Sequence, residues 1–318
     1  MLLSRVAESV YWAGRYLERT EATARLVKVH TELYCDLPLS CGIGWSPLLA
    51  VTGSRTAFDE RHPTPTEDQV VAFLAADPDQ PGSIASAVAA ARHNLKVTRN
   101  LLPPSTWEAI NDLHHWVGDT AADAIPRRSR LYWMDQVIRH CHLIAGSMAA
   151  TMCRDDAHSF LEVGRHLERA DMTTRVLDVQ AGILVQGTGP DLAPYSDITW
   201  MSVLRSLAAD HMFRRSTLGV LSGPEALRFL LRDPTFPRSV ERSLTEISRA
   251  LIELPGHDTA MATTAGVQAS LEDLDVESLA ERGLHEFVDA VQAGLATVHD
   301  ELAAAYFQPV ASGDAVAV

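Results

Sequence analysis

The sequence predicts an all-α protein built as a tandem-duplicated helical bundle. Hydrophobic residues recur at helical spacing along most of the 318-residue chain, whereas the alternation typical of strands is almost absent. An unusual hexapeptide, G-R-x-L-E-R, occurs at residues 14–19 and again at residues 164–169. Prolines fall between the periodic segments or at their ends, where a missing amide hydrogen does least harm. These three observations together favour helices packed on helices.

The duplication extends well beyond the hexapeptide. The further matches are, in order, Glu21 with Asp171, Thr23 with Thr173, Arg25 with Arg175, Val29 with Val179, Trp45 with Trp200, Leu49 with Leu204, Phe58 with Phe213, and the run 73–84 with the run 229–240. Such collinear matches predict two halves, residues 1–154 and 155–308, packed as one body with pseudo-two-fold symmetry. Residues 309–318 have no periodicity and are expected to form a disordered tail.

Ten segments show helical periodicity, and each has a recognisable beginning or end. They are residues 2–36, 66–76, 82–102, 104–124, 128–153, 156–186, 198–216, 223–232, 237–254 and 275–307. The first and sixth carry the repeated hexapeptide. The second begins with a capping box formed by Thr66 and Gln69, and prolines begin or precede the fourth, fifth and ninth. Segments 37–65 and 186–197 are predicted to be loops with short helical turns.

Composition excludes several classes of protein. A hydrophobic content of 47% supports a large buried core, and a net charge of -14 without a long basic run argues against nucleic-acid binding. The start of the chain lacks the pattern of a signal peptide, and no stretch reaches the length of a membrane span, so we expect a cytoplasmic protein that does not enter membranes. The four cysteines lack zinc-site spacing and are expected to be buried or half-buried thiols.

A charged stripe runs along the duplicated helix. On a helical wheel, Gly14, Glu18, Glu21 and Arg25 lie within an arc of about 60°. The second copy repeats this layout with Gly164, Glu168, Asp171 and Arg175. Glycine in mid-helix costs about 1 kcal/mol relative to alanine, a cost that is usually offset by the close approach of another backbone. We therefore expect the two long helices to cross near the glycines, with both stripes facing a shared centre.

Three interpretations of this centre are open. The stripes can form buried salt bridges that fix the register of the two helices. They can instead line a polar pocket, in which Glu18 and Glu168 are the candidate catalytic residues and act as general bases. The carboxylates of Glu18, Glu21, Glu168 and Asp171 can also hold Mg²⁺ or Mn²⁺ in an independent metal-dependent enzyme, although neither copy has the Glu-x-x-His element of di-iron bundles.

The remaining polar candidates lie away from the stripe. Four arginines point 100° to 140° away from the glycines and are expected to make a different contact, such as anchoring neighbouring helices or a partner. The candidate binding residues are Glu21, Arg25, Asp171, Arg175, Arg15, Arg19, Arg165 and Arg169. His140 and His142 are two positions apart and cannot share a helix face, which argues against a metal pair. No motif for a resident cofactor is present.

The doubled G-R-x-L-E-R-x-[ED]-x-T-x-R signature resembles the bacterial alpha-E family of all-helical proteins, which is named for a Glu-Arg motif. Supporting stretches are Ala91-Arg92-His93-Asn94, Trp107-Glu108-Ala109-Ile110-Asn111, the run from Phe229 to Val240, and Leu284-His285-Glu286-Phe287 with Tyr306-Phe307. The resemblance covers nearly the whole chain. It departs at Leu95-Lys96, where the family commonly has Ala-Arg. The Glu-Arg residues of the family correspond here to Glu18, Arg19, Glu168 and Arg169.

This resemblance implies a partner. Genes of such proteins tend to lie beside, or be fused to, a gene for a circularly permuted ATP-grasp ligase-like protein, and often a transglutaminase-like protease. The expected role is therefore an accessory or second catalytic component in forming an amide or peptide bond, with the Glu/Arg stripe binding a substrate, an intermediate or the ligase. A purely structural scaffold is the alternative within the same complex.

Overall fold

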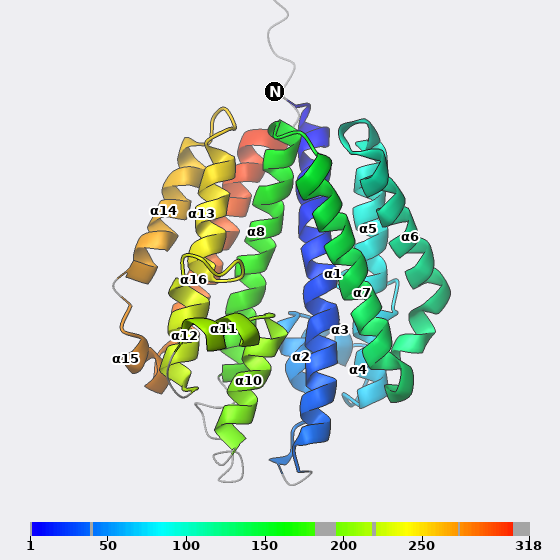
Figure 1. The fold of residues 1–318 in the computed structure, drawn as a ribbon, viewed down its shortest axis with the longest axis vertical. Coiled ribbons are helices and arrows are strands. Elements are labelled where there is room, and N and C mark those ends of the chain that lie inside the picture. The colour runs from blue at the N-terminus through cyan, green and yellow to red at the C-terminus, as the bar shows by residue number, and fades with distance from the viewer. Residues whose placement is uncertain (1, 39–40, 182–194, 218–220, 273, 308–318) are drawn as a thin grey trace, which may run out of the picture.

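The computed structural model describes residues 2–38, 41–181, 195–217, 221–272 and 274–307. Within these ranges the chain is helical and contains no strand, which confirms the all-α prediction (Figure 1). None of the described helices is long and apolar enough to cross a bilayer.

Two long helices form the centre of the bundle. Helix α1 (Ser4–Asp36) and helix α8 (Asp156–Val176) run side by side and in the same direction, and they make the most extensive helix pair of the described fold (Figure 1). Both bury residues almost all round, including polar ones. The predicted boundary between the halves falls in the short connection that precedes α8.

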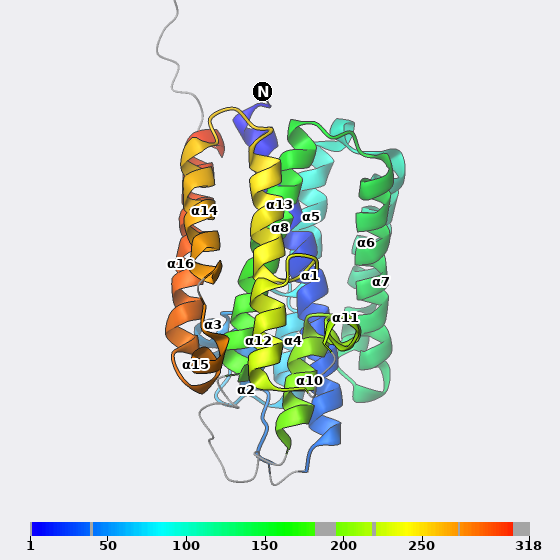
Figure 2. The same cartoon turned by 60° about the vertical axis from the view of Figure 1, so that its left-hand side comes forward.

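Each central helix is covered by three further helices. Around α1 lie α5 (Ile84–Val97), α6 (Pro104–Thr120) and α7 (Arg127–Thr151), with α6 packed on the other two. Around α8 lie α13 (Val240–Leu251), α14 (Asp258–Glu272) and α16 (Leu284–Leu302), with α14 packed on the other two. Figure 2 shows α1 and α8 between the pair α6 and α7 and the pair α14 and α16. The order of elements thus repeats, while pseudo-two-fold symmetry and the exact division into halves stay predictions.

Short helices complete the lower end of the bundle in Figure 1. They are α2 (Ser46–Val51), α3 (Arg55–Asp59), α4 (Glu67–Ala75), α10 (Ser196–Ser206), α11 (Asp210–Ser216), α12 (Gly223–Arg232) and α15 (Val276–Glu281). Single 3-10 turns follow α5 and α6 at Arg99–Leu101 and Ala121–Ala124, and wider π turns extend α8 and α16 over Leu177–Ala181 and Ala303–Phe307. The helical turns expected within 37–65 are α2 and α3.

Most predicted helices are found with shifted ends, and two are broken. The segment 198–216 divides into α10 and α11 at Ala208, which has a left-handed φ of 53°. The segment 275–307 divides into α15 and α16 at Gly283, whose φ is 84°. Left-handed backbone cannot continue a right-handed helix, so each position ends one helix and starts another. Part of the predicted helix 156–186, most of the loop 186–197 and the tail 309–318 lie outside the described residues.

Helix α14 was missed by the sequence prediction. Its buried positions are Ala260, Thr264, Val267 and Leu271, which are spaced at three and four residues. Two of these four side chains are small or polar, so the apolar stripe that marks a surface helix is weak here.

Two local predictions are wrong. Thr66 does not cap the backbone of α4, because its hydroxyl donates to Oε1 of Gln69 at 2.7 Å. Cys35 and Cys153 are exposed rather than buried, since they lie near helix ends, whereas Cys141 is buried and Cys41 is half-buried. The cysteines form no disulfide.

Candidate functional site

The two central helices cross at their glycines. A Cβ atom on Gly14 would overlap the carbonyl oxygen of Leu161, and a Cβ atom on Gly164 would overlap the carbonyl oxygen of Tyr11. Each glycine therefore lies directly on the backbone of the other helix, which confirms the predicted crossing. Only a residue without a side chain permits this approach.

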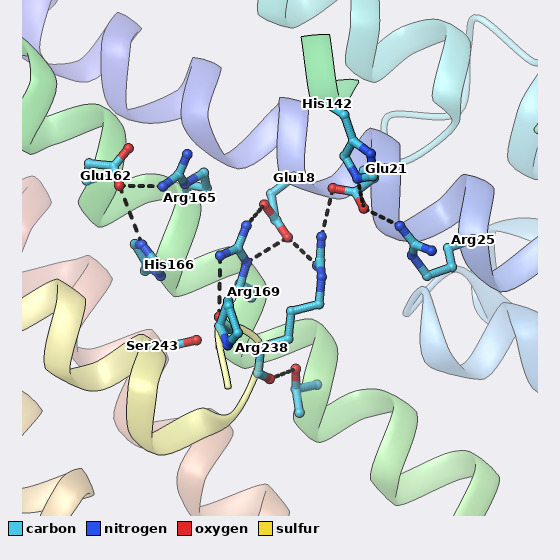
Figure 3. Close-up of polar contacts among 12 residues, drawn as sticks. Glu18, Glu21, Arg25, His142, Glu162, Arg165, His166, Arg169, Arg238 and Ser243 are labelled. Carbon is cyan, nitrogen blue, oxygen red and sulfur yellow. Dashed lines mark hydrogen bonds and ion pairs between the residues drawn. The ribbon is translucent and has the colours of Figure 1, made fainter. Parts of the chain in front are cut away.

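Two reciprocal ion pairs lie one turn beyond the crossing. Arg169 on α8 donates from Nε and Nη2 to Oε1 and Oε2 of Glu18 on α1, at 2.9 and 2.7 Å (Figure 3). Arg19 on α1 donates from Nε and Nη2 to Oε1 and Oε2 of Glu168 on α8, at 2.5 and 2.9 Å. Such two-pronged pairing is the strong form of the arginine–carboxylate contact. Each Glu-Arg dipeptide thus uses its glutamate and its arginine across the same interface.

A second arginine binds each central glutamate. Arg238, in the loop before α13, donates from Nη1 to Oε1 of Glu18 at 2.5 Å and from Nη2 to Oε2 of Glu21 at 2.7 Å (Figure 3). Glu168 instead receives Nε of Arg15 on its Oε2 at 2.7 Å. Arg165 occupies the position in α8 that matches Arg15, yet it turns away and pairs with Glu162 at 2.5 Å. Arg15, Arg19 and Arg169 thus anchor the neighbouring central helix, which is one of the contacts expected of them, but they do so by binding the stripe glutamates rather than a separate group.

The outer carboxylates of the two stripes differ in their surroundings. Glu21 accepts Nη2 of Arg25 at 2.6 Å, Arg238, and Nε2 of His142 at 3.2 Å (Figure 3). Asp171 accepts Nε of Arg175 on Oδ2 at 2.9 Å. Among the described residues no other side chain donates to the carboxylate of Asp171.

Burial and arginines act in opposite directions on the central glutamates. Glu18 is 4% exposed and Glu168 is 1% exposed. Burial raises the pKa of Glu18, but Arg169 and Arg238 outweigh it and hold this pKa at about 2. Arg15 and Arg19 likewise outweigh burial and lower the pKa of Glu168. The pKa of Glu21 also lies well below its usual value, and Arg238 is the arginine that lowers it most.

This electrostatic state limits what the two glutamates can do. A general base works best with a pKa near the working pH and with a free lone pair. Glu18 has a pKa of about 2 and three hydrogen bonds from arginines. Glu168 has a lowered pKa and also three such bonds. The geometry therefore favours the interpretation in which buried ion pairs fix the register of α1 and α8.

Two hollows flank the ion-pair network. The first, which we call the Gly82 cleft, has a volume of about 320 Å³ and is lined by Arg19, Thr23, Gly53, Gln80, Gly82, Glu168, Asp171 and Arg175, among others. The second, which we call the Arg238 cleft, has a volume of about 210 Å³ and is lined by Glu18, Glu21, Cys141, His142, Arg169 and Arg238, among others. The two stripes thus face two separate clefts rather than one shared pocket.

The arrangement does not favour one metal ion held by all four stripe carboxylates. A metal site needs at least three His, Cys, Asp or Glu side chains whose ligand atoms lie close together. In the described part of the chain such a group, with ligand atoms within 4.8 Å of one another, occurs at Asp178, His285 and Asp289. The stripe carboxylates form no such group. Arginines already occupy the oxygens of Glu18, Glu21 and Glu168. The Asp178 group lies largely exposed on the surface, where acidic clusters without a metal are common.

The two Glu-Arg pairs at this interface correspond to a known family signature. The model of the Alpha-E family, described as a predicted α-helical domain with a conserved ER motif, matches residues 2–307. The chain belongs to the Alpha-E family. In this Alpha-E protein the dipeptides Glu18-Arg19 and Glu168-Arg169 exchange partners across the helix crossing.

Curated relatives of this Alpha-E protein are mycobacterial and longer. Uncharacterized proteins of Mycobacterium tuberculosis and Mycobacterium bovis are each 23% identical to it in an alignment of 274 residues that covers 79% of this chain and 30% of the relative. The chain therefore spans about a third of the length of the relatives it matches. No solved structure matches the chain significantly.

Two residues of the Alpha-E network were not anticipated from sequence. Arg238 lies 220 positions from Glu18, and the sequence prediction puts it in the first turn of the helix 237–254, whereas in the structure it belongs to the loop before α13, which begins at Val240. His142 was considered only as half of a metal pair, yet it contacts Glu21 from α7. A signal existed in the duplicated run, where Arg238 aligns with Gly82 between the matched pairs Pro81/Pro237 and Ser83/Ser239.

Proposed function

We propose that this Alpha-E protein is the helical accessory component of an ATP-grasp amide or peptide ligase system. Its ion-pair network forms a rigid frame, and the Gly82 cleft beside the frame holds a polar substrate for the ligase. One observation supports a binding role above the others. Each central glutamate accepts three hydrogen bonds from arginines, while Oδ1 of Asp171 and the terminal nitrogens of Arg175 in the adjoining cleft have no partner among the described residues.

The size and lining of the cleft suit a small polar molecule. Ligand sites commonly have volumes of about 300–1,000 Å³ and use a few placed polar groups to orient the ligand. The Gly82 cleft, at about 320 Å³, offers the carboxylate of Asp171 and the guanidinium of Arg175 in its wall. Both groups come from α8, which is held in register by the buried pairs. A site supported by a locked helix keeps its geometry when the ligand binds.

The length of the mycobacterial relatives supports a partnership. Since this chain covers 30% of each relative, those proteins carry a further region beside the Alpha-E unit. The resemblance to alpha-E proteins implies that this region, or a separate chain, is an ATP-grasp ligase. The helical unit would then work next to the site of ATP use, and a transglutaminase-like protease would be a second partner.

The test is ATP turnover by the ATP-grasp protein encoded beside this chain, measured with and without it. Wild-type protein is expected to stimulate turnover in the presence of the amine substrate, and Asp171→Asn is expected to lose that stimulation. Glu277→Gln serves as a control, because Glu277 forms an exposed pair with Arg228 and neither residue lines the cleft. Absence of stimulation, together with separate elution of the two proteins in gel filtration, would overturn the proposal.

A scaffold role is the second candidate, and the same observation on the glutamates favours it. In that case stimulation would persist in Asp171→Asn, because the frame remains intact when the cleft is altered. The frame variant Glu168→Gln would then reduce stimulation only in proportion to the loss of folded protein, which circular dichroism measures.

A further inference from the structure

The loops that precede α5 and α13 are built in the same way. Ser83 and Ser239 cap these helices by accepting the amide hydrogens of Ser86 and Arg242, both at 3.0 Å. Each serine hydroxyl also donates at 2.5 Å to the carbonyl oxygen six residues earlier, that of Asp77 or Asp233. The residues immediately before the two serines therefore hold matching places in the two loops.

These matching places carry Gly82 in one loop and Arg238 in the other. Arg238 extends from its loop and bridges Glu18 and Glu21 on the opposite central helix. Gly82 faces the matching carboxylates, those of Glu168 and Asp171, across the Gly82 cleft. No described side chain bridges Glu168 and Asp171 as Arg238 bridges Glu18 and Glu21, and the cleft is lined by Gly82 and by both of these carboxylates.

We propose that the Gly82 cleft binds the guanidinium group of an arginine-like ligand in place of the missing side chain. The inference rests on the proposed function for its biological setting, because it names the class of substrate that the accessory component would hold. The binding itself is a property of this chain and does not depend on a ligase.

The acceptors needed by such a group are available. In the Arg238 cleft the guanidinium donates to Oε1 of Glu18 and Oε2 of Glu21. In the Gly82 cleft Oε1 of Glu168 receives one hydrogen bond, from Arg19, and Oδ1 of Asp171 receives none from the described residues. A planar guanidinium can donate to both oxygens at once, as it does in the matching cleft.

The charge around the cleft indicates that the ligand also carries an anionic group. Glu168 and Asp171 carry two negative charges against the three positive charges of Arg15, Arg19 and Arg175, so a further cation alone would add to an existing excess of positive charge. The terminal nitrogens of Arg175 donate to no described residue, and they lie beside Gly53 at the cleft wall. A carboxylate of the ligand would satisfy them.

The polar lining on the Gly82 side supports the same ligand. Gln80 is 7% exposed and lines the cleft, and its side-chain amide makes no hydrogen bond within the described residues. The matching residue in the other loop is Phe236, which is buried among apolar side chains. A polar amide in the wall of a cleft can donate to or accept from a polar ligand, which the side chain of Phe236 cannot do. The combined preference is for a guanidinium and a carboxylate on one small molecule, as in free arginine or a peptide that ends in arginine.

Isothermal titration of the full chain with L-arginine tests the proposal. L-citrulline replaces the guanidinium by a neutral urea of the same shape, and agmatine lacks the carboxylate. We expect saturable binding of L-arginine and at least about tenfold weaker binding of L-citrulline and of agmatine, since a hydrogen bond to a charged group contributes about 1.5–3 kcal/mol. Equal binding of L-arginine and L-citrulline, or no binding of L-arginine, would overturn the proposal.

The matched variant is Gly82→Arg, which supplies the missing side chain from within. A Cβ atom at Gly82 has its nearest neighbour at 3.6 Å, an ordinary contact with Gln80, so a side chain can begin at this position without a clash. It is expected to abolish L-arginine binding, and Gly82→Ala is expected to keep it. Unchanged binding by a folded Gly82→Arg would contradict the proposed position. Binding that is present without any effect on ATP turnover would refute the ligase partnership and leave the arginine site standing.

Discussion

Arg169 and Glu18 lie 151 positions apart in the chain and are joined by two parallel hydrogen bonds between α8 and α1. Arg19 and Glu168 repeat this arrangement in the opposite direction. A single buried pair of this kind is weak evidence for stability, because desolvation of the charges offsets most of the attraction. Two reciprocal pairs on either side of a two-helix interface have a different consequence. They can all form only when the helices stand in one register.

Neutralising one central glutamate is expected to destabilise the fold. Glu168→Gln keeps the size of the side chain but leaves Arg15 and Arg19 without a buried anion. Removal of one partner from a buried pair typically costs about 3–5 kcal/mol, so urea unfolding should show a loss in that range. Asp59→Asn, in an exposed pair with Arg55, should change the free energy of unfolding by less than about 1 kcal/mol. Equal effects of the two variants would contradict the structural role of Glu168.

Substitution of either crossing glycine is expected to force the central helices apart. The Cβ atom of Gly14→Ala would meet the carbonyl oxygen of Leu161, and a backbone atom cannot rotate away as a flexible side chain can. Overpacking of a core usually costs about 1–3 kcal/mol, and we expect the upper part of this range.

Gly146 provides the matched control for that prediction. It lies within α7, and a Cβ atom there meets nothing within 4 Å. Gly146→Ala should therefore stabilise the protein by about 0.5–1 kcal/mol, because alanine is the better helix former. A thermal-melting comparison in which both alanine variants are neutral or stabilising would show that α1 and α8 do not touch at Gly14.

The sequence allowed prediction of the crossing but not of the full network. Gly14 and Gly164 could be found because a helical wheel and the cost of mid-helix glycine act within one helix. The partners of Glu18 and Glu21 depend on how loops return to the bundle, and Arg238 comes from the loop before α13, where the sequence predicts the first turn of a helix instead. Helix α14 was missed for a related reason, since Thr264 interrupts its apolar stripe.

Acid is expected to unfold the protein through its central carboxylates. The pKa of Glu18 is lowered in the folded protein from 4.5 to about 2, so the unfolded chain binds more protons below neutral pH. The stabilisation is fully present above pH 4.5 and is lost as the pH falls towards 2. The free energy of unfolding, measured by urea titration at pH 7, 5, 4 and 3, should fall steeply over the last two steps.

The variant Glu18→Gln separates this effect from general acid destabilisation. The substitution removes one carboxyl group whose pKa is lowered in the folded protein. The free energy of unfolding of the variant should therefore depend less on pH between 4.5 and 2 than that of the wild type. Two parallel curves would mean that Glu18 titrates normally and that its arginine pairs do not persist in solution.

Removal of Arg238 should open a second cleft that a small guanidinium compound can fill. Arg238→Ala leaves Glu18 and Glu21 without their bridging cation, and a loss of about 3 kcal/mol or more is expected for a buried pair. Millimolar methylguanidine should raise the melting temperature of this variant, because a ligand that binds only the folded state stabilises it by mass action.

Arg249→Ala is the control, since Arg249 is exposed and pairs with Glu246 at the surface. Stabilisation of Arg238→Ala alone would show that a carboxylate pair at this interface selects a guanidinium when its own arginine is absent, which is the situation that Gly82 creates naturally. An equal response of the two variants would mean that methylguanidine acts on the protein non-specifically and that the carboxylates do not form a site.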